Sequence, residues 1–115
     1  MRTTGVIVGL ALGLSLTAPA VAQTPAGPGA AAPLSSAQLY QQRTCIACHG
    51  ADAKTPILPI YPNLAGQNPE YLLQQMRDIK SGARSNGNTA AMRGVMHLVS
   101  DEELKAIADW LGGLE

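Results

Sequence analysis

The sequence predicts a small all-α domain. Three segments combine helix-terminal residues with apolar side chains at helical spacing, and they begin near residues 36, 69 and 101. The stretches between them contain prolines, glycines and asparagines and lack the alternation of apolar and polar residues that is typical of strands. The chain has 115 residues, which is enough for one domain.

The first predicted helix covers residues 36–45. Ser35 and Gln38 form the pattern of a capping box, in which each side chain satisfies a backbone N–H of the other residue. Leu39 and Tyr40 give this helix an apolar side.

The second predicted helix covers residues 69–81. Asn68 is a suitable N-cap, and Pro69 suits the first helical position because its missing N–H would have no partner there. Gly82 is expected to end the helix. Three apolar residues recur at helical spacing: Leu72, Met76 and Ile79.

The third predicted helix covers residues 101–111. Ser100 and Glu103 form a second capping box, and three acidic residues in the first turn suit the helix dipole. Gly112 and Gly113 are expected to stop the helix. Its apolar stripe consists of Leu104, Ile107, Ala108 and Leu111.

Two segments between these helices are expected to be irregular. Residues 51–67 contain three prolines and no alternating pattern. Residues 85–99 begin with the turn-rich sequence SNGN and contain Met92, Met96 and His97.

The N-terminus has the features of a secretory signal peptide, predicted for residues 1–22. Arg2 supplies the positive charge, an apolar run follows, and the sequence AVA forms a cleavage site before Gln23. The alternative is an uncleaved membrane anchor, but the run is short for a span of about 20 apolar residues. We therefore expect a periplasmic protein that would touch the membrane only if this segment were retained.

The processed chain is expected to consist of a flexible Ala/Pro/Gly-rich leader, residues 23–34, and one domain, residues 35–115. Removing Arg2 with the signal peptide leaves seven Lys and Arg residues against eight Asp and Glu, a net charge near −1. No basic stripe indicates a nucleic-acid surface, so nucleic acid is not an expected partner.

The sequence TCIACHG places Cys45 and Cys48 three positions apart, with His49 directly after them. A thiol–disulfide pair usually heads a helix in an α/β domain, but strands are not predicted here. A closed zinc site needs four ligands, and beyond this motif only His97 remains. The third interpretation is covalent haem attachment, which C-x-x-C-H specifies directly.

Haem attachment also explains the spacing. The two thiols add to the two vinyl groups of one porphyrin edge, and two intervening residues on a helical turn match that separation. The histidine then presents its imidazole to the iron. Export agrees, because this attachment takes place outside the cytoplasm, and a chain with no Phe and one Trp gains core volume from an apolar cofactor. We therefore predict one haem c, with Cys45 and Cys48 as covalent attachment points and His49 as the proximal iron ligand.

Three stretches resemble class I c-type cytochromes: CIACHG, YPNLAGQNPEYLLQQMRDIKSGARSN and MRGVMHLVSDEELKAIADWL. The chain is most similar to the branch that includes tandem two-haem bacterial cytochromes, although its single C-x-x-C-H predicts a one-haem member. The resemblance implies a small cytochrome c fold, with three to five helices wrapped around one covalently attached haem. It also implies that the first and last helices cross, with Tyr40 and Trp110 near the crossing.

The resemblance implies Met92 as the distal iron ligand, because it precedes an R-G pair ahead of the Ser-capped last helix. Met96 is the second choice. Met76 lies on an apolar stripe and is expected in the core, and His97 is expected to face solvent. The resemblance also implies that the carbonyl of Pro62 accepts the other imidazole N–H of His49, which would orient the ring.

The function predicted is one-electron transfer between redox proteins, such as respiratory complexes, oxidases or periplasmic dehydrogenases, by a monomer that catalyses no bond chemistry and so is not an enzyme. The alternative is a dedicated haem subunit of an oxidoreductase complex, docked through the leader and an apolar surface at residues 96–99. A peroxidase or gas sensor would need an open sixth iron position, which the methionine-rich segment disfavours.

Overall fold

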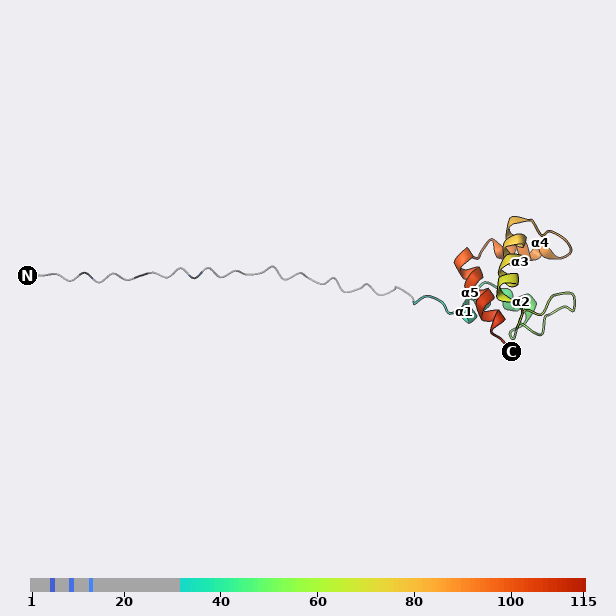
Figure 1. The fold of residues 1–115 in the computed structure, drawn as a ribbon, viewed down its shortest axis with the longest axis horizontal. Coiled ribbons are helices and arrows are strands. Elements are labelled where there is room, and N and C mark those ends of the chain that lie inside the picture. Colours follow the sequence, from blue (N-terminus) through green and yellow to red (C-terminus); the bar gives the residue numbers. More distant parts are fainter. Residues whose placement is uncertain (1–4, 6–8, 10–12, 14–31) are drawn as a thin grey trace, which may run out of the picture. The chain divides into compact units, whose positions relative to one another are not determined.

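The computed structural model describes residues 32–115 and three isolated glycines before them. Apart from those glycines, the predicted signal peptide (1–22) lies outside the described residues, as does most of the predicted leader (23–34). The described domain is all-helical and contains no strand. Its helices, labelled in Figure 1, are α1 (Ser36–Gln42), α2 (Cys45–His49), α3 (Pro69–Ser81), α4 (Thr89–Met96) and α5 (Asp101–Gly112).

The predicted helix starts at α1, α3 and α5 are confirmed by their caps. Capping boxes close at Ser35 and Ser100, and the side chain of Asn68 accepts a hydrogen bond from the backbone N–H of Tyr71. At the end of α3, Gly82 adopts the left-handed conformation, with φ of 89°, that an L-residue rarely takes. These three helices therefore begin where local side-chain chemistry directs them to begin.

The prediction of one helix over residues 36–45 is wrong. Helix α1 ends at Gln42, and after a two-residue turn the chain starts a separate short helix, α2. Thr44 sets the break, because its φ of 64° is left-handed and cannot continue a right-handed helix. The cysteine motif thus lies on a helix of its own, which is not collinear with α1.

The prediction that residues 85–99 are irregular is also wrong, because this segment contains α4. No side chain caps α4 at Asn88, so its start carries no local signal. Packing stabilises it instead, since Met96 is buried and Val95 packs against the core.

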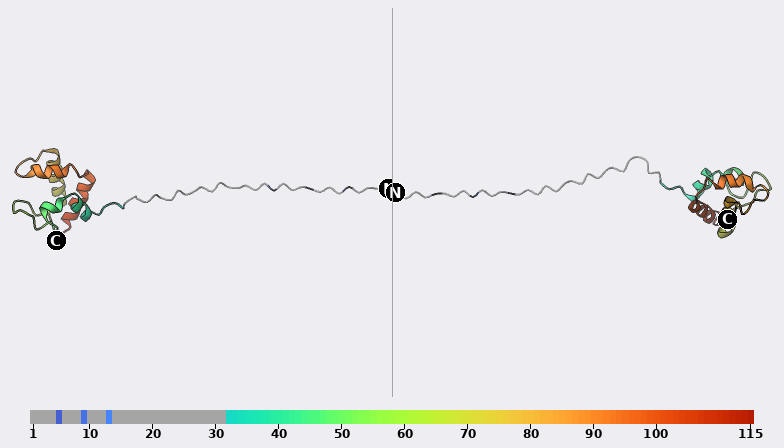
Figure 2. Two further views of the ribbon diagram at one scale, coloured as in Figure 1. Left: turned by 180° about the vertical axis from the view of Figure 1, so that it is seen from behind. Right: turned by 90° about the horizontal axis from the view of Figure 1, so that it is seen from above.

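The core lies where the first and last helices meet and where α3 packs against both α4 and α5. Tyr40 of α1 and Trp110 of α5 have ring centroids 5.2 Å apart, which confirms the crossing implied by the resemblance. In Figure 1 and in the left view of Figure 2, α4 lies above α2 in the domain. Residues of both helices line the candidate site.

Candidate functional site

A cavity of about 440 Å³ opens in the interior of the domain, which is a volume typical of cofactor pockets. Its lining comes from all five helices, together with Thr44, residues 60–67 and residues 84–88. We call α2 together with residues 50–67 the proximal wall, and residues 84–99 the distal wall.

The proximal wall carries all three residues of the predicted attachment motif, and each of them lines the cavity. Cys45 is half-buried and Cys48 is exposed. Burial raises the pKa of the Cys45 thiol to about 11. Among the described residues, no group of three or more His, Cys, Asp or Glu side chains is placed to hold a metal ion.

His49 is a buried polar residue, 6% exposed, and its orientation is fixed by one contact. Its Nδ1 lies 3.1 Å from the carbonyl oxygen of Pro62. Because a carbonyl only accepts, Nδ1 carries the proton and donates, which leaves Nε2 as the ring nitrogen able to bind iron. Burial lowers the pKa of His49, and the hydrogen bond to Pro62 partly opposes that shift. The neutral imidazole, which is the form that binds iron, is thereby favoured.

Tyr40 and Gly50 hold the end of α2 in a way that the sequence reasoning missed. The Tyr40 hydroxyl donates to the Gly50 carbonyl oxygen at 2.7 Å, and burial raises the pKa of this phenol well above its usual value. Gly50 has φ of 84°, and a Cβ there would lie 2.2 Å from the carbonyl oxygen of Thr55. The available signal was a tyrosine on an apolar helix face, because a buried hydroxyl needs a partner.

The rest of the proximal wall folds back over α2 through backbone hydrogen bonds. The N–H of Ile57 donates to the carbonyl oxygen of Cys48 at 3.0 Å, and the N–H of Leu64 donates to that of Ala53 at 2.8 Å. This return brings Tyr61 to a ring-centroid distance of 6.3 Å from His49 and places Pro62 at its imidazole.

On the other side of the cavity, Met92 and Met96 line the distal wall one helical turn apart on α4. Met92 is half-buried, whereas Met96 is only 1% exposed and belongs to the core. Met76 of α3 is buried and also lines the cavity. His97 is exposed and does not line it. Three thioethers therefore border the cavity, and the second imidazole does not.

A polar rim borders the cavity beside α4. Arg84 is half-buried there, and its Nη1 donates to Oε1 of Gln75 at 2.8 Å. Asn86, Asn88 and Thr89 continue this rim. The cavity has an apolar interior and carries two cysteines, an imidazole and three thioethers in its lining, and these residues would suit a haem, which would supply one-electron chemistry there.

The comparisons with known proteins identify the family. The sequence model of the family described as cytochrome c matches residues 35–115. The chain is 40% identical over 72 residues to cytochrome c-554(548) of Halomonas halodenitrificans, which covers 63% of this chain and 86% of that protein. It is 43% identical over 99 residues to cytochrome c4 of Pseudomonas aeruginosa, which covers 86% of this chain and 42% of that protein.

A third relative is the thiosulfate dehydrogenase electron acceptor of Stutzerimonas stutzeri, 42% identical over 64 residues, which covers 56% of this chain and 28% of that protein. The chain thus spans most of the first relative, under half of cytochrome c4 and under a third of the electron acceptor.

Proposed function

Because the chain belongs to the cytochrome c family, whose members carry electrons on covalently bound haem c, we propose that it is a periplasmic one-electron carrier with a single haem. Family membership confirms the predicted cofactor, the all-α fold and the relation to the cytochrome c4 branch. In this proposal, Cys45 and Cys48 form the two thioether bonds. The support is that both thiols line the same cavity from one short helix.

His49 and Met92 are the proposed axial ligands. The observation that carries this proposal is the buried His49 imidazole, fixed through Nδ1 to Pro62 while lining the cavity opposite α4. Met92 is favoured over Met96 because Met96 is committed to the core, whereas Met92 is half-buried at the cavity. When bound, the haem supplies an iron that gains and loses one electron.

The residues of this chain have two tasks in that function. Pro62 holds the His49 ring in one tautomer and one orientation, so the ligand does not have to reorganise between oxidation states. A methionine opposite histidine raises the reduction potential and blocks the position at which oxygen or a substrate would bind. The chain is therefore proposed to act as a carrier and not as an enzyme.

The partners are proposed to be redox proteins. The relative named as a thiosulfate dehydrogenase electron acceptor supports a dehydrogenase as the electron donor. The free carrier is favoured over a permanently docked subunit, because Met96 and Val99 are buried and Leu98 is the one exposed large apolar side chain in the surface expected at residues 96–99. The free carrier is proposed to be a monomer. None of the helices in the described part of the chain has the length and apolar character to cross a bilayer.

An optical spectrum of the purified, haem-loaded protein tests the proposal. We expect the absorption of a c-type haem in the reduced protein, and a methionine–iron band in the oxidised protein. Mass spectrometry is expected to show one haem that remains attached after denaturation. Rapid binding of carbon monoxide to the reduced protein at neutral pH would contradict the carrier and favour an enzyme or a gas sensor.

A further inference from the structure

We propose that the loop Ile57–Ile60 is the docking surface for a redox partner whose own contact face is apolar and uncharged. The inference rests on the proposed electron-carrier function and adds to it the surface of exchange and the chemistry of the partner. In the description below, this segment is called the apolar loop.

Exposure singles out the apolar loop. Six large apolar side chains are exposed among the described residues, and three of them fall within these four positions. Ile57 is 67% exposed, Leu58 46% and Ile60 71%. Single exposed apolar residues are ordinary, but a cluster of them is typical of an interaction site.

The apolar loop is attached directly to the helix that carries the attachment motif. The backbone N–H of Ile57 donates to the carbonyl oxygen of Cys48 at 3.0 Å. Cys48 is itself exposed, and Ile60 lines the mouth of the cavity. A partner bound to the apolar loop would therefore lie beside Cys48, one of the two proposed attachment points. An electron would have a shorter path to it than to a partner bound elsewhere on the domain.

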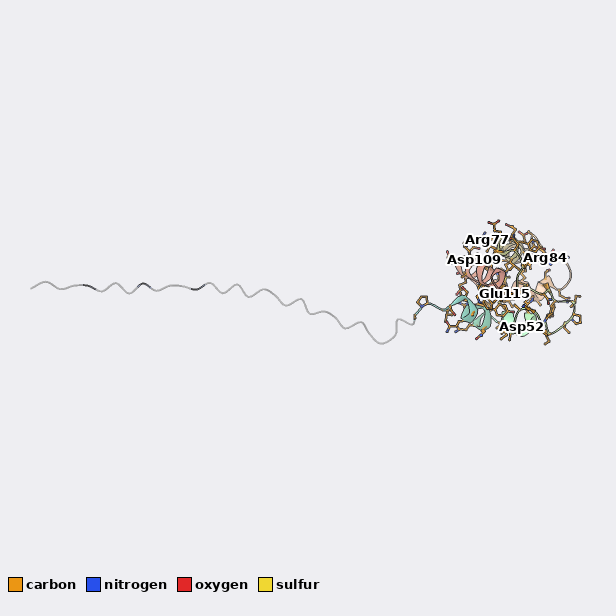
Figure 3. All side chains as sticks on the ribbon, turned by 60° about the horizontal axis from the view of Figure 1, so that its bottom comes forward. Asp52, Arg77, Arg84, Asp109 and Glu115 are labelled. Atoms are coloured by element: carbon orange, nitrogen blue, oxygen red, sulfur yellow. The ribbon has the colours of Figure 1, made fainter. Side chains whose placement is uncertain are left out.

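The apolar loop lies in an uncharged stretch of the chain, which begins directly after the exposed residues Asp52 and Lys54. Residues 55–69 contain no Asp, Glu, Lys, Arg or His over fifteen consecutive positions. The carboxylate of Asp52, just before this run, accepts hydrogen bonds from the N–H groups of Lys54 and Thr55 and from the Thr55 hydroxyl. In Figure 3, Arg77 and Asp109 lie at the opposite end of the domain from Asp52. A charged partner would find no complementary group on the loop, and it would lose hydration on docking.

The size of the apolar loop favours a transient complex. A stable interface uses about 20–30 residues on each side and buries about 1,200–2,000 Å² in total. Three protruding side chains are a small part of that, as is typical of weak electron-transfer encounters. In each encounter one molecule loses one electron and the other gains it, and no covalent bond forms or breaks.

Electron self-exchange between oxidised and reduced copies of the full, haem-loaded protein tests the inference, because a second copy presents the same uncharged face. The rate constant is measured from NMR line broadening in mixtures of the two states. We expect Ile57→Ser/Leu58→Ser to lower it about tenfold, within the range that interface variants span. Leu98→Ser is the matched control, since Leu98 is 65% exposed and lies outside the cavity, and it is expected to leave the rate unchanged.

The dependence of the self-exchange rate constant on salt concentration is a second test of the inference. We expect the wild-type rate to change little between about 0.01 M and about 1 M salt, although the Debye length falls from about 30 Å to about 3 Å. Ile57→Lys places like charges face to face, so its rate is expected to be lower than that of the wild type and to rise with salt. This variant tests the surface independently of the serine pair.

Several results would overturn the inference. These are an unchanged rate in both loop variants, an equal loss in Leu98→Ser, or a steep salt dependence in the wild type. A stable dimer in sedimentation that the serine pair dissociates would make the loop a homodimer interface, and flotation with phosphatidylcholine vesicles that the pair abolishes would make it a membrane contact. The absence of any reversible one-electron couple would instead refute the proposed function. The loop variants are expected to keep the wild-type spectrum and potential.

Discussion

The proximal wall is fixed by hydrogen bonds that involve the backbone, whereas the distal wall is fixed mainly by apolar packing. On the proximal side, Tyr40, Pro62 and Ile57 each tie part of the return loop or of α1 to the motif helix. On the distal side, Met96 and Val99 are buried in the core, and one Lys side chain of α3 donates to the Val99 carbonyl.

These two kinds of contact determine which substitutions each wall tolerates. Hydrogen bonds to main-chain carbonyls depend on one backbone path, and Gly50 is needed because any Cβ would meet the Thr55 carbonyl. Apolar packing depends on side-chain volume. Met96 of α4 supplies volume to the core, whereas Met92, one turn away, remains available to the cavity. We therefore expect binding of iron and stability of the fold to be separable on the distal side and coupled on the proximal side.

The largest effect is expected from removing both attachment points. Cys45→Ala/Cys48→Ala should prevent covalent haem attachment. The domain of residues 35–115 would then contain an unfilled cavity of about 440 Å³, and we expect it to be largely unfolded because so small a domain has little other core. Mass spectrometry checks the attachment, and far-UV circular dichroism checks the helices. A cooperatively folded double variant with wild-type helicity would show that packing alone holds both walls.

The proposed proximal ligand, His49, could be predicted from the sequence because its signal is local. C-x-x-C-H fixes the identities and the spacing of three residues within five positions, and the caps at Ser35 and Ser100 are equally local patterns. The distal helix was not accessible, since Asn88 makes no cap and Gly94 disfavours a helix. Packing of Met96 and Val95 against other helices stabilises α4, and that is a property of the folded chain.

The turn at Thr44 was missed for the same reason. The left-handed φ of 64° costs free energy for a threonine, and the neighbouring residues contain no pattern that predicts such a turn. The Tyr40–Gly50 and Ile57–Cys48 contacts join residues ten and nine positions apart. Each contact ends on a main-chain carbonyl, which every residue carries, so the sequence does not identify the partner.

Met92→Ala separates iron binding from folding on the distal side. We expect the haem to stay attached, the methionine–iron band to disappear and the reduction potential to fall on the order of 0.1 V, a fraction of the ~0.8 V that axial ligands span. Redox titration and the spectrum of the oxidised protein measure both. Retention of the band would transfer the ligand assignment to Met96 or Met76.

Met96→Ala is the matched variant one turn away. Because Met96 is 1% exposed, its truncation should lower the free energy of unfolding by about 2–5 kcal/mol while the methionine–iron band remains. Chemical denaturation with parallel spectra gives both values. Loss of the band without loss of stability would reverse the roles of the two methionines.

Tyr40→Phe tests the hydrogen-bonded wall with a smaller change. It keeps the ring against Trp110 and removes only the donor to the Gly50 carbonyl, so we expect a loss of about 1 kcal/mol in unfolding free energy. Trp110→Phe is a useful comparison, because it alters the ring pair and leaves the hydroxyl bond in place. If Tyr40→Phe has no effect, this bond does not contribute to fixing the proximal wall.

The smallest expected effect on stability comes from the ion pair between Arg43 and Glu103, which links the end of α1 to α5. Arg43, directly after α1, donates from Nε to Glu103 of α5 at 3.2 Å and also pairs with it through Nη2. This hydrogen bond, together with that from the Ser100 N–H, lowers the pKa of Glu103. A lowered folded-state pKa stabilises the fold above the unfolded pKa of about 4.3, and this contribution disappears as the pH falls through the folded value.

Glu103→Gln should therefore lose less melting temperature on acidification below about pH 4.3 than the wild type does. Glutamine still accepts the Ser100 N–H, so the variant removes the charge and keeps the capping box. Glu102→Gln, an exposed neighbour, is the control and should follow the wild type. Both side chains of the ion pair are partly exposed, so screening keeps its contribution small, and about 1 M salt should reduce the difference further. If Glu103→Gln and Glu102→Gln have the same pH profile, the ion pair between Arg43 and Glu103 does not stabilise the fold.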